Sequence, residues 1–242
     1  MFDGDGSYVI GSFDGEKYTP ETPKMKSDFG ANYYATQTWS NIPESDGRTI
    51  QIAWMRNGEF PGMPFKGQMT FPCELSLKKY MDGIKLVRKP IKEIELLHSK
   101  GEVWENKNLI PGINKNLARG VKDDCLHIVG SFKVKTADSF GFVVRLDKKD
   151  NGTEITYTTK TNILACMGKS AVVEPVDGVL KLDILLDRSS IEIFANDGKV
   201  AMSSCFTPSD NAYGLYLFNT GGEIFVEKLE VYPMKSIYQK EK

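Results

Sequence analysis

Leu180 to Gly198 reads LKLDILLDRSSIEIFANDG, and the placing of apolar residues in this stretch decides the fold class. Its first half has an apolar residue at every second position, namely Leu180, Leu182, Ile184 and Leu186. Because the side chains of a strand point alternately to opposite faces, this period of two is typical of a strand with one buried face. Ile191 and Ile193 repeat the period, and Asn196-Asp197-Gly198 is a turn signal. The stretch therefore predicts consecutive antiparallel strands.

Similar strand candidates occupy the rest of the C-terminal half. They lie at Leu126–Val134, Phe140–Leu146, Leu215–Phe218 and Ile224–Tyr232. Turn residues separate strand candidates at intervals of about 8–12 residues, which is the pattern of an antiparallel β-sandwich. We predict that residues 117–242 form this sandwich domain. The polar stretch 90–116 is expected to link it to the preceding part of the chain.

Residues 1–89 also have strand character. The candidates are Ser7–Phe13, Tyr33–Trp39, Thr49–Trp54, Gln68–Leu77 and Ile84–Arg88. Asp14-Gly15, Asp46-Gly47 and Asp82-Gly83 are hairpin signals between them. These strands are too few to close a barrel or a propeller, so we expect an open edge unless further polypeptide completes the sheet. Helical periodicity is limited to a short stretch, Pro90 to His98.

The composition is that of an ordinary globular protein of 242 residues with a formal net charge of -1. No excess of one sign would attract nucleic acid or an anionic membrane, and we expect neither as a partner. The densest basic cluster, Lys78 to Lys92 with Arg88 included, is interpreted as a solvated strand face. The four cysteines and two histidines are too scattered for a zinc site, so no metal and no other cofactor is expected.

Carboxylates are candidates for chemistry, because hydrolysis of a glycosidic bond uses two of them about 5–9 Å apart. Glu59 and Glu74 are the best placed in the first part, although a surface carboxylate or a structural ion pair explains each of them more simply. The acidic residues around Gly152 lack the spacing of a calcium loop and are interpreted as a hairpin turn. Ser189 and Ser190 have no histidine near them in sequence to activate a hydroxyl. We therefore name no catalytic residue.

Aromatic residues give a second signal, because the C–H faces of sugars stack on rings and their hydroxyls pair with amides and carboxylates. The segment YYATQTW at 33–39 offers rings and an amide on one expected strand. Alternation places Tyr33 and Gln37 on one face of this strand and Tyr34 on the other. The loop that follows Trp54 is rich in Gly, Pro and aromatic residues, as loops that line binding sites often are. Packing in a core is the alternative for most of these rings.

Several segments carry a resemblance to a known family. They are GSFDG at 11–15, DFGANYYATQTW at 28–39, IAWM at 52–55, QMTFPCELSL at 68–77, KPIKEI at 89–94 and LDRSSIEIFANDG at 186–198. In this order they resemble glycoside hydrolase family 32, which includes invertases, inulinases and levanases. No single segment is decisive, but the ordered set runs over nearly the whole chain and is specific.

The resemblance implies a five-bladed β-propeller followed by a β-sandwich, with residues 1–89 as the C-terminal fragment of the propeller. It also implies hydrolysis of the β-fructosyl linkages of levan, inulin or sucrose with retention, by an Asp nucleophile and a Glu acid/base. The family's Trp-Met-Asn-Asp-Pro-Asn, Arg-Asp-Pro and Glu-Cys-Pro motifs do not occur in this sequence, and Pro72-Cys73-Glu74 has the reversed order. We therefore expect this chain to be inactive alone, with the N-terminal part of the propeller as its missing partner.

On the same resemblance, one group of residues is expected to help shape the substrate pocket: Tyr33, Tyr34, Gln37, Trp54, Glu59 and Phe60. Members of the family that act on polymers are secreted, periplasmic or attached to the cell surface, whereas the sequence itself leaves the compartment open. The competing hypothesis is a non-catalytic β-sandwich module that binds carbohydrate or only braces the propeller.

Overall fold

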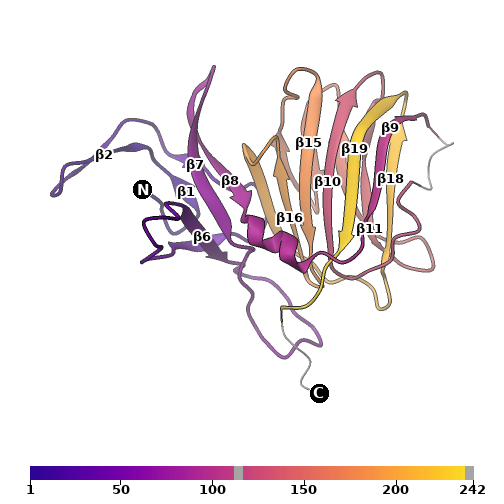
Figure 1. The fold of residues 1–242 in the computed structure, drawn as a ribbon, viewed down its shortest axis with the longest axis horizontal. Coiled ribbons are helices and arrows are strands. Elements are labelled where there is room, and N and C mark those ends of the chain that lie inside the picture. Colours follow the sequence, from indigo (N-terminus) through magenta and orange to yellow (C-terminus); the bar gives the residue numbers. More distant parts are fainter. Residues whose placement is uncertain (112–116, 238–242) are drawn as a thin grey trace.

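The computed structural model describes residues 1–111 and 117–237, and its regular structure consists of β-strands and one 3-10 helix. Figure 1 shows two parts side by side, with the N-terminal strands in indigo and purple and a larger body in pink, orange and yellow. The all-β fold class expected from the period of two is therefore confirmed. Among the described residues, no helix is long and apolar enough to cross a membrane.

The larger body is a sandwich of two antiparallel sheets. One sheet has six strands in the order β17-β16-β15-β10-β19-β9, and the other has five in the order β14-β13-β12-β11-β18. The strand bounds are β9 Glu102–Leu109, β10 Leu126–Val134, β11 Ser139–Leu146, β12 Thr153–Thr158, β13 Ile163–Cys166, β14 Lys169–Val172, β15 Val179–Leu186, β16 Ser190–Ala195, β17 Val200–Cys205, β18 Gly214–Thr220 and β19 Ile224–Pro233. The apolar residues at alternate positions between Leu180 and Ile193 thus lie in β15 and β16, which pair directly.

The space between these two sheets is the main hydrophobic core. The alternating residues of β15 lie in it and are at most 1% exposed: Leu180, Leu182, Ile184 and Leu186. Phe132 of one sheet packs against Phe140 and Phe142 of the other, with ring centroids 5.4 and 5.9 Å apart. Full burial of one large apolar side chain contributes about 1.5–3 kcal/mol. The sandwich therefore has an apolar core made from its own strands.

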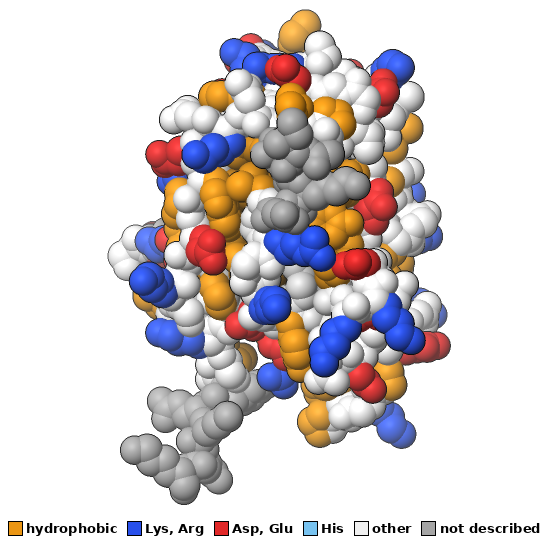
Figure 2. Space-filling view, turned by 90° about the vertical axis from the view of Figure 1, so that its right-hand side faces the viewer, with side chains coloured by type: hydrophobic (Ala, Val, Ile, Leu, Met, Phe, Trp, Pro, Cys, Tyr) orange, Lys and Arg blue, Asp and Glu red, His pale blue; other side chains and the backbone are white. Residues whose placement is uncertain are grey.

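The surface of the sandwich is mixed in charge. Figure 2 looks onto the right-hand side of Figure 1, where β9 and β18 lie, and shows basic and acidic side chains interspersed with apolar ones. Ion pairs at the surface include Lys160 with Asp138 at 2.9 Å and Lys135 with Glu223 at 3.7 Å. Exposed pairs of this kind contribute at most about 1 kcal/mol each, so they serve solubility more than stability.

The N-terminal part contains a four-stranded antiparallel sheet in the order β5-β6-β7-β8 and two small sheets, β1-β4 and β2-β3. The strand bounds are β1 Ser7–Tyr8, β2 Gly11–Phe13, β3 Tyr18–Pro20, β4 Met25–Lys26, β5 Tyr34–Thr38, β6 Thr49–Trp54, β7 Cys73–Tyr80 and β8 Gly83–Pro90. The expected strand Ser7–Phe13 is thus split into β1 and β2, and the strand expected at Gln68–Leu77 begins only at Cys73.

Strand β5 departs from the alternation that its sequence predicts. Ala35 has φ 47°, and the pairing of β5 with β6 changes register between Tyr34 and Gln37. An irregularity of this kind inserts a residue and redirects the side chains that follow it. Tyr33 is therefore half-buried while Gln37 is exposed, and the two do not share one face as expected.

The stretch 90–116, expected as a linker, contains regular structure where it is described. It holds the 3-10 helix η1 (Lys92–Leu97) and strand β9, which pairs with β19 at the edge of the six-stranded sheet. Residues of this stretch therefore belong in part to the sandwich.

A second apolar cluster joins the two parts. Ile50 and Cys73 of the four-stranded sheet, together with Ile94 of η1, pack against Leu185 and Phe194 of the sandwich. Leu185 and Phe194 lie outside the main core, on the outer face of the six-stranded sheet. Because the first part covers this face, β16 is buried along its whole length, where a period of two would leave alternate residues exposed.

Candidate functional site

The junction of the two parts begins where a short segment around Gly30 runs along β17, an edge strand of the six-stranded sheet. The backbone N–H of Phe29 donates to Ala201 O at 2.8 Å, and that of Asn32 donates to Ser203 O at 3.0 Å. A Cβ on Gly30 would lie only 2.1 Å from Ser203 O, so this close approach requires glycine. The segment satisfies backbone groups that an open edge would leave unpaired.

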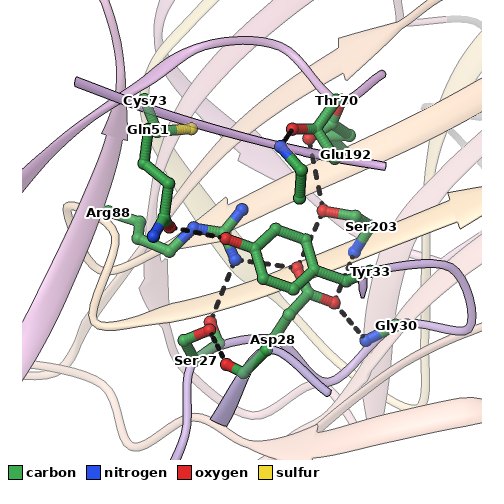
Figure 3. Close-up of polar contacts among 12 residues, drawn as sticks. Ser27, Asp28, Gly30, Tyr33, Gln51, Thr70, Cys73, Arg88, Glu192 and Ser203 are labelled. Carbon is green, nitrogen blue, oxygen red and sulfur yellow. Dashed lines mark hydrogen bonds and ion pairs between the residues drawn. The ribbon is translucent and has the colours of Figure 1, made fainter. Parts of the chain in front are cut away.

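A buried ion pair lies beneath this segment (Figure 3). Arg88 Nη1 donates to Asp28 Oδ2 at 3.0 Å, and each side chain is 2% exposed. Asp28 Oδ1 accepts from the backbone N–H groups of Gly30 and Ser203 at 2.7 and 3.0 Å. The Arg88 guanidinium also lies 4.0 Å from the centre of the Tyr33 ring. A pair sealed in this way is strongly destabilised when one partner is lost, because the other charge stays buried.

Glu192 of β16 joins the cluster from the sandwich side. Its Oε1 accepts from the Phe71 N–H of the first part at 2.7 Å. The Ser203 hydroxyl lies 2.7 Å from Asp28 Oδ2 and 3.2 Å from Glu192 Oε2, and it has a single proton to donate. Burial raises the pKa of Glu192 to about 8. A proton on Glu192 at neutral pH resolves the shortage of donors between the two carboxyls.

Asp28 and Glu192 face each other across Ser203, yet they are not placed to attack a substrate. Glu192 is 0% exposed, and the Ser203 side chain occupies the space between the two carboxyls. Neither acid lines the cavity of about 510 Å³ between the loop after β6 and the sandwich. Their contacts cross from one part to the other, so this polar cluster holds the parts together.

Tyr33 and Tyr34, neighbours in sequence, have different surroundings. The Tyr33 hydroxyl donates to Gln51 Oε1 at 2.7 Å, within the buried junction. Tyr34 lies edge-on to Trp54 with ring centroids 6.2 Å apart, and the Arg56 guanidinium lies 4.5 Å from the centre of its ring. Trp54 is 41% exposed. Tyr34 and Trp54 therefore form an accessible aromatic pair, while Tyr33 belongs to the junction.

The remaining expected pocket residues lie in two places. Gln37 is exposed on β5, where its amide donates to Thr38 O at 3.3 Å. Glu59 and Phe60 lie in the loop after β6 and line a shallow cavity of about 320 Å³. Phe60 also lines a cavity of about 510 Å³ whose opposite wall belongs to the sandwich. The structure thus pairs Tyr34 with Trp54 and Glu59 with Phe60.

Sequence reasoning missed the residues of the polar cluster. The interpretation of the basic Lys78–Lys92 cluster as a solvated face is wrong for Arg88, which is buried beneath the Tyr33 ring. The available signal was Glu192, an acidic residue between two core isoleucines. A strand period puts it on the outer face of its sheet, and only cover from another part of the chain buries that face.

The fold and the junction define a class of protein, in which a four-stranded antiparallel sheet is joined to a β-sandwich through a buried polar cluster. The family model for the glycosyl hydrolases family 32 N-terminal domain matches residues 3–90. The model for the glycosyl hydrolases family 32 C terminal matches residues 93–233. The chain belongs to glycoside hydrolase family 32, as the ordered segments of its sequence indicated.

Curated relatives extend over nearly the whole chain. A levanase of Bacillus subtilis (strain 168) is 32% identical over 260 residues, which cover 96% of this chain and 38% of the levanase. An extracellular exo-inulinase of Aspergillus awamori is 24% identical and covers 96% of this chain and 48% of its own length. A sucrose-6-phosphate hydrolase of Zymomonas mobilis is 26% identical over 89% of this chain and 44% of its own length. The chain spans less than half the length of these relatives.

Solved structures agree in fold. The exo-inulinase of Aspergillus awamori superposes with a TM-score of 0.85 at 22% identity, over 96% of this chain and 50% of that structure. Fructan 1-exohydrolase IIa of Cichorium intybus superposes with a TM-score of 0.77 at 18% identity, over 98% of this chain and 56% of that structure. The expected architecture, the last blades of a β-propeller followed by an antiparallel β-sandwich, is therefore confirmed.

Proposed function

We propose that this chain is the C-terminal portion of a hydrolase that cleaves β-fructosyl linkages in levan, inulin or sucrose with retention. The observation that supports this most is the match to family 32 over both parts of the chain, at residues 3–90 and 93–233. A retaining mechanism requires a nucleophilic carboxylate and an acid/base carboxylate about 5–5.5 Å apart. The names of the relatives, levanase, exo-inulinase and sucrose-6-phosphate hydrolase, give the range of substrates to test.

In this proposal the chain shapes and braces the substrate pocket but does not supply its reactive carboxylates. None of the family's three catalytic motifs occurs in the sequence. Asp28 and Glu192 are sealed from solvent and committed to the junction. Strand β5 is an edge strand of the four-stranded sheet, where only the Ala35 N–H among its described backbone groups bonds outside the sheet, to Gly4 O at 2.8 Å, and Trp39 beside it is 47% exposed. The N-terminal propeller strands, as the partner of this chain, would pair along that edge.

The fructosyl pocket would take its walls from the accessible residues of the first part. Tyr34 and Trp54 offer ring faces, while Gln37 and Glu59 offer an amide and a carboxylate for sugar hydroxyls. Phe60 would close the pocket from the loop after β6. Tyr33, whose hydroxyl is already bonded to Gln51, would hold this region in place rather than touch the sugar.

Incubation of the purified chain with sucrose, inulin and levan tests the catalytic part of the proposal. We expect no fructose above a blank, because the two carboxylates that lower the barrier are not supplied. Released fructose would overturn this expectation. Calorimetric titration with short fructo-oligosaccharides tests the pocket, and we expect Trp54→Ala to weaken binding while Phe13→Ala, an exposed ring on β2, leaves it unchanged.

A non-catalytic module is the second candidate, and the separate core of the sandwich favours it. Saturable heat on titration with fructo-oligosaccharide, without hydrolysis in any reconstituted protein, would support a module that only binds carbohydrate. A flat titration would support a module that only braces the propeller. One of the relatives is named as extracellular, and we accordingly propose a secreted, periplasmic or cell-surface location.

A further inference from the structure

The chain passes from the N-terminal part to the sandwich through η1, the magenta helix that follows β8 in Figure 1. Glu93 of this helix pairs with Arg48, the residue before β6, at 2.7 Å. His98, directly after the helix, lies against the sandwich and forms a backbone bridge with Met234, the residue after β19. The helix is therefore held to the first part near its start and to the sandwich at its end.

The only two histidines of the chain, His98 and His127, meet at this end of the helix. His98 Nε2 lies 2.8 Å from His127 Nδ1, and His127 Nε2 lies 2.9 Å from Asp183 Oδ1. His127, on β10, is 6% exposed, and the His98 ring stacks on Tyr232 of β19 with centroids 4.2 Å apart. Burial of one ring and stacking of the other hold the two nitrogens at hydrogen-bond distance. Neither ring lines the cavity of about 510 Å³ at the junction.

The bonds of this pair determine where its protons lie. A carboxylate only accepts hydrogen bonds, so His127 donates from Nε2 to Asp183. The Nδ1 atom of a neutral His127 then carries no proton, and it accepts from His98 Nε2. A first added proton can lie on Nδ1 of His98, which leaves this bond intact. A second added proton places N–H groups of both charged rings opposite each other, so the bond between the rings is lost.

The charged groups around the pair favour the first proton more than the second. Three acids face the pair from the elements packed around it, namely Glu95 of η1, Asp183 of β15 and Glu230 of β19. Glu230 already accepts from Lys228 at 3.0 Å and from the Tyr232 hydroxyl at 2.8 Å. Burial and the neighbouring His127 outweigh the acids and lower the pKa of His98 below its ordinary value of 6.5. The unfolded chain therefore binds more protons just below this pH, so the contact stabilises the fold above pH 6.5 and is lost as the pH falls.

We propose that the His98–His127 pair is an acid-sensitive latch on the connection between the two parts. The latch is closed while the pair holds at most one added proton and opens when it holds two. Opening releases the end of η1 and the residues before β9 from the sandwich, whereas the Asp28–Arg88 pair keeps the two parts joined. The proposal is independent of the proposed function, because it requires neither a substrate nor a catalytic carboxylate.

Amide hydrogen exchange of the full chain at pH 7 and pH 4.5 tests the latch. The reporters are the N–H groups of Ser99 and Lys235, which donate to Pro233 O and Leu97 O, both at 2.8 Å. After correction for the intrinsic effect of pH on exchange, we expect their protection to fall at least about tenfold between pH 7 and pH 4.5. Amides of the five-stranded sheet, which carries neither histidine, should keep their protection.

His98→Gln keeps a donor for His127 without a group that titrates, because its side-chain amide can donate to Nδ1 at either pH. We expect protection at Ser99 and Lys235 in this variant to be the same at pH 7 and pH 4.5. Lys160→Gln introduces the same residue at a side chain that is 81% exposed, and this control should lose protection as the unaltered chain does.

Equal protection of the unaltered chain at both pH values would overturn the latch. An equal fall in His98→Gln would also overturn it, because other groups would then cause the change. NMR titration of the imidazole C–H signals decides without any variant, since the chain has only these two histidines. Two separate steps, the second below pH 6.5, support the latch, whereas a single step shared by both rings overturns it.

Discussion

The two parts of this molecule bury their apolar side chains in different ways. The sandwich closes a core between its own sheets, where Phe132 and Phe140 are 0% exposed. The N-terminal part buries Ile50 and Cys73 largely against the outer face of the sandwich, and it leaves Phe13 66% exposed. An open sheet of four strands needs neighbours to be stable. The difference indicates that the sandwich is an independent folding unit and that the N-terminal part depends on it.

Separation of the two parts should give the largest effect. We expect residues 99–242, which retain β9, to unfold cooperatively in urea, and residues 1–90 alone to lack a cooperative transition. Starting the polypeptide at residue 117, the proposed domain boundary, removes β9 from its pairing with β19 and should lower the stability of the sandwich. Circular dichroism and urea titration measure this. A cooperative transition from residues 1–90 alone would show that the N-terminal part folds independently of the sandwich.

Substitution of Asp28 should give the next largest effect, because it weakens the junction without altering either apolar core. Asp28→Asn leaves the Arg88 guanidinium buried without its carboxylate, and we expect a loss of about 3–5 kcal/mol in the free energy of unfolding. Asp3→Asn is the control, because Asp3 pairs with Lys24 on the solvent-exposed surface, and its substitution should change the stability far less. Equal losses for the two variants in urea titration would show that the junction is not a major source of stability.

The sequence predicts the sandwich well and the junction poorly, and the reason is physical. A period of two is a local property, so Leu180 to Leu186 reveal their buried face without knowledge of the rest of the chain. Arg88 and Glu192 depend on contacts with Asp28 and Phe71, which lie 60 and 121 residues away in sequence, and no local pattern encodes these contacts. The bulge at Ala35 is similar, because one residue in a left-handed conformation redirects the side chains that follow. The pairing of Tyr34 with Trp54 could be expected only from the family resemblance.

The proton on Glu192 gives the junction a dependence on pH that the sandwich core lacks. Burial raises the pKa of Glu192 in the folded state to about 8 from its ordinary value of 4.5, so the folded state binds more protons than the unfolded state between these pH values. The contribution of Glu192 is therefore full below pH 4.5 and is lost as pH rises toward 8. In Glu192→Gln an amide can donate to Ser203 and accept from Phe71, so this loss should disappear.

Urea titration at pH 5 and pH 8 measures the effect of Glu192→Gln. Between these two pH values, we expect the free energy of unfolding of the unaltered chain to fall by on the order of 1–3 kcal/mol more than that of the variant. Glu174→Gln, at an exposed position of the sandwich, is the control. Its free energy of unfolding should fall between pH 5 and pH 8 as much as that of the unaltered chain. If Glu192→Gln follows the same pH profile as the unaltered chain, Glu192 is ionised in the folded protein and the donor argument at Ser203 is wrong.

The smallest expected effect separates two adjacent tyrosines, one committed to the junction and one to the proposed pocket. Tyr33→Phe keeps the ring beside Arg88 but removes the hydroxyl that donates to Gln51, a residue 2% exposed. We expect a loss of about 1 kcal/mol in stability and unchanged fructo-oligosaccharide binding. Tyr34→Ala should have the opposite effect, because the Tyr34 ring packs beside the exposed Trp54. We expect it to weaken fructo-oligosaccharide binding and to change the stability by less than Tyr33→Phe does. If Tyr33→Phe weakens binding as much as Tyr34→Ala does, Tyr33 contacts the sugar directly, and the boundary between junction and pocket lies one residue earlier than the structure indicates.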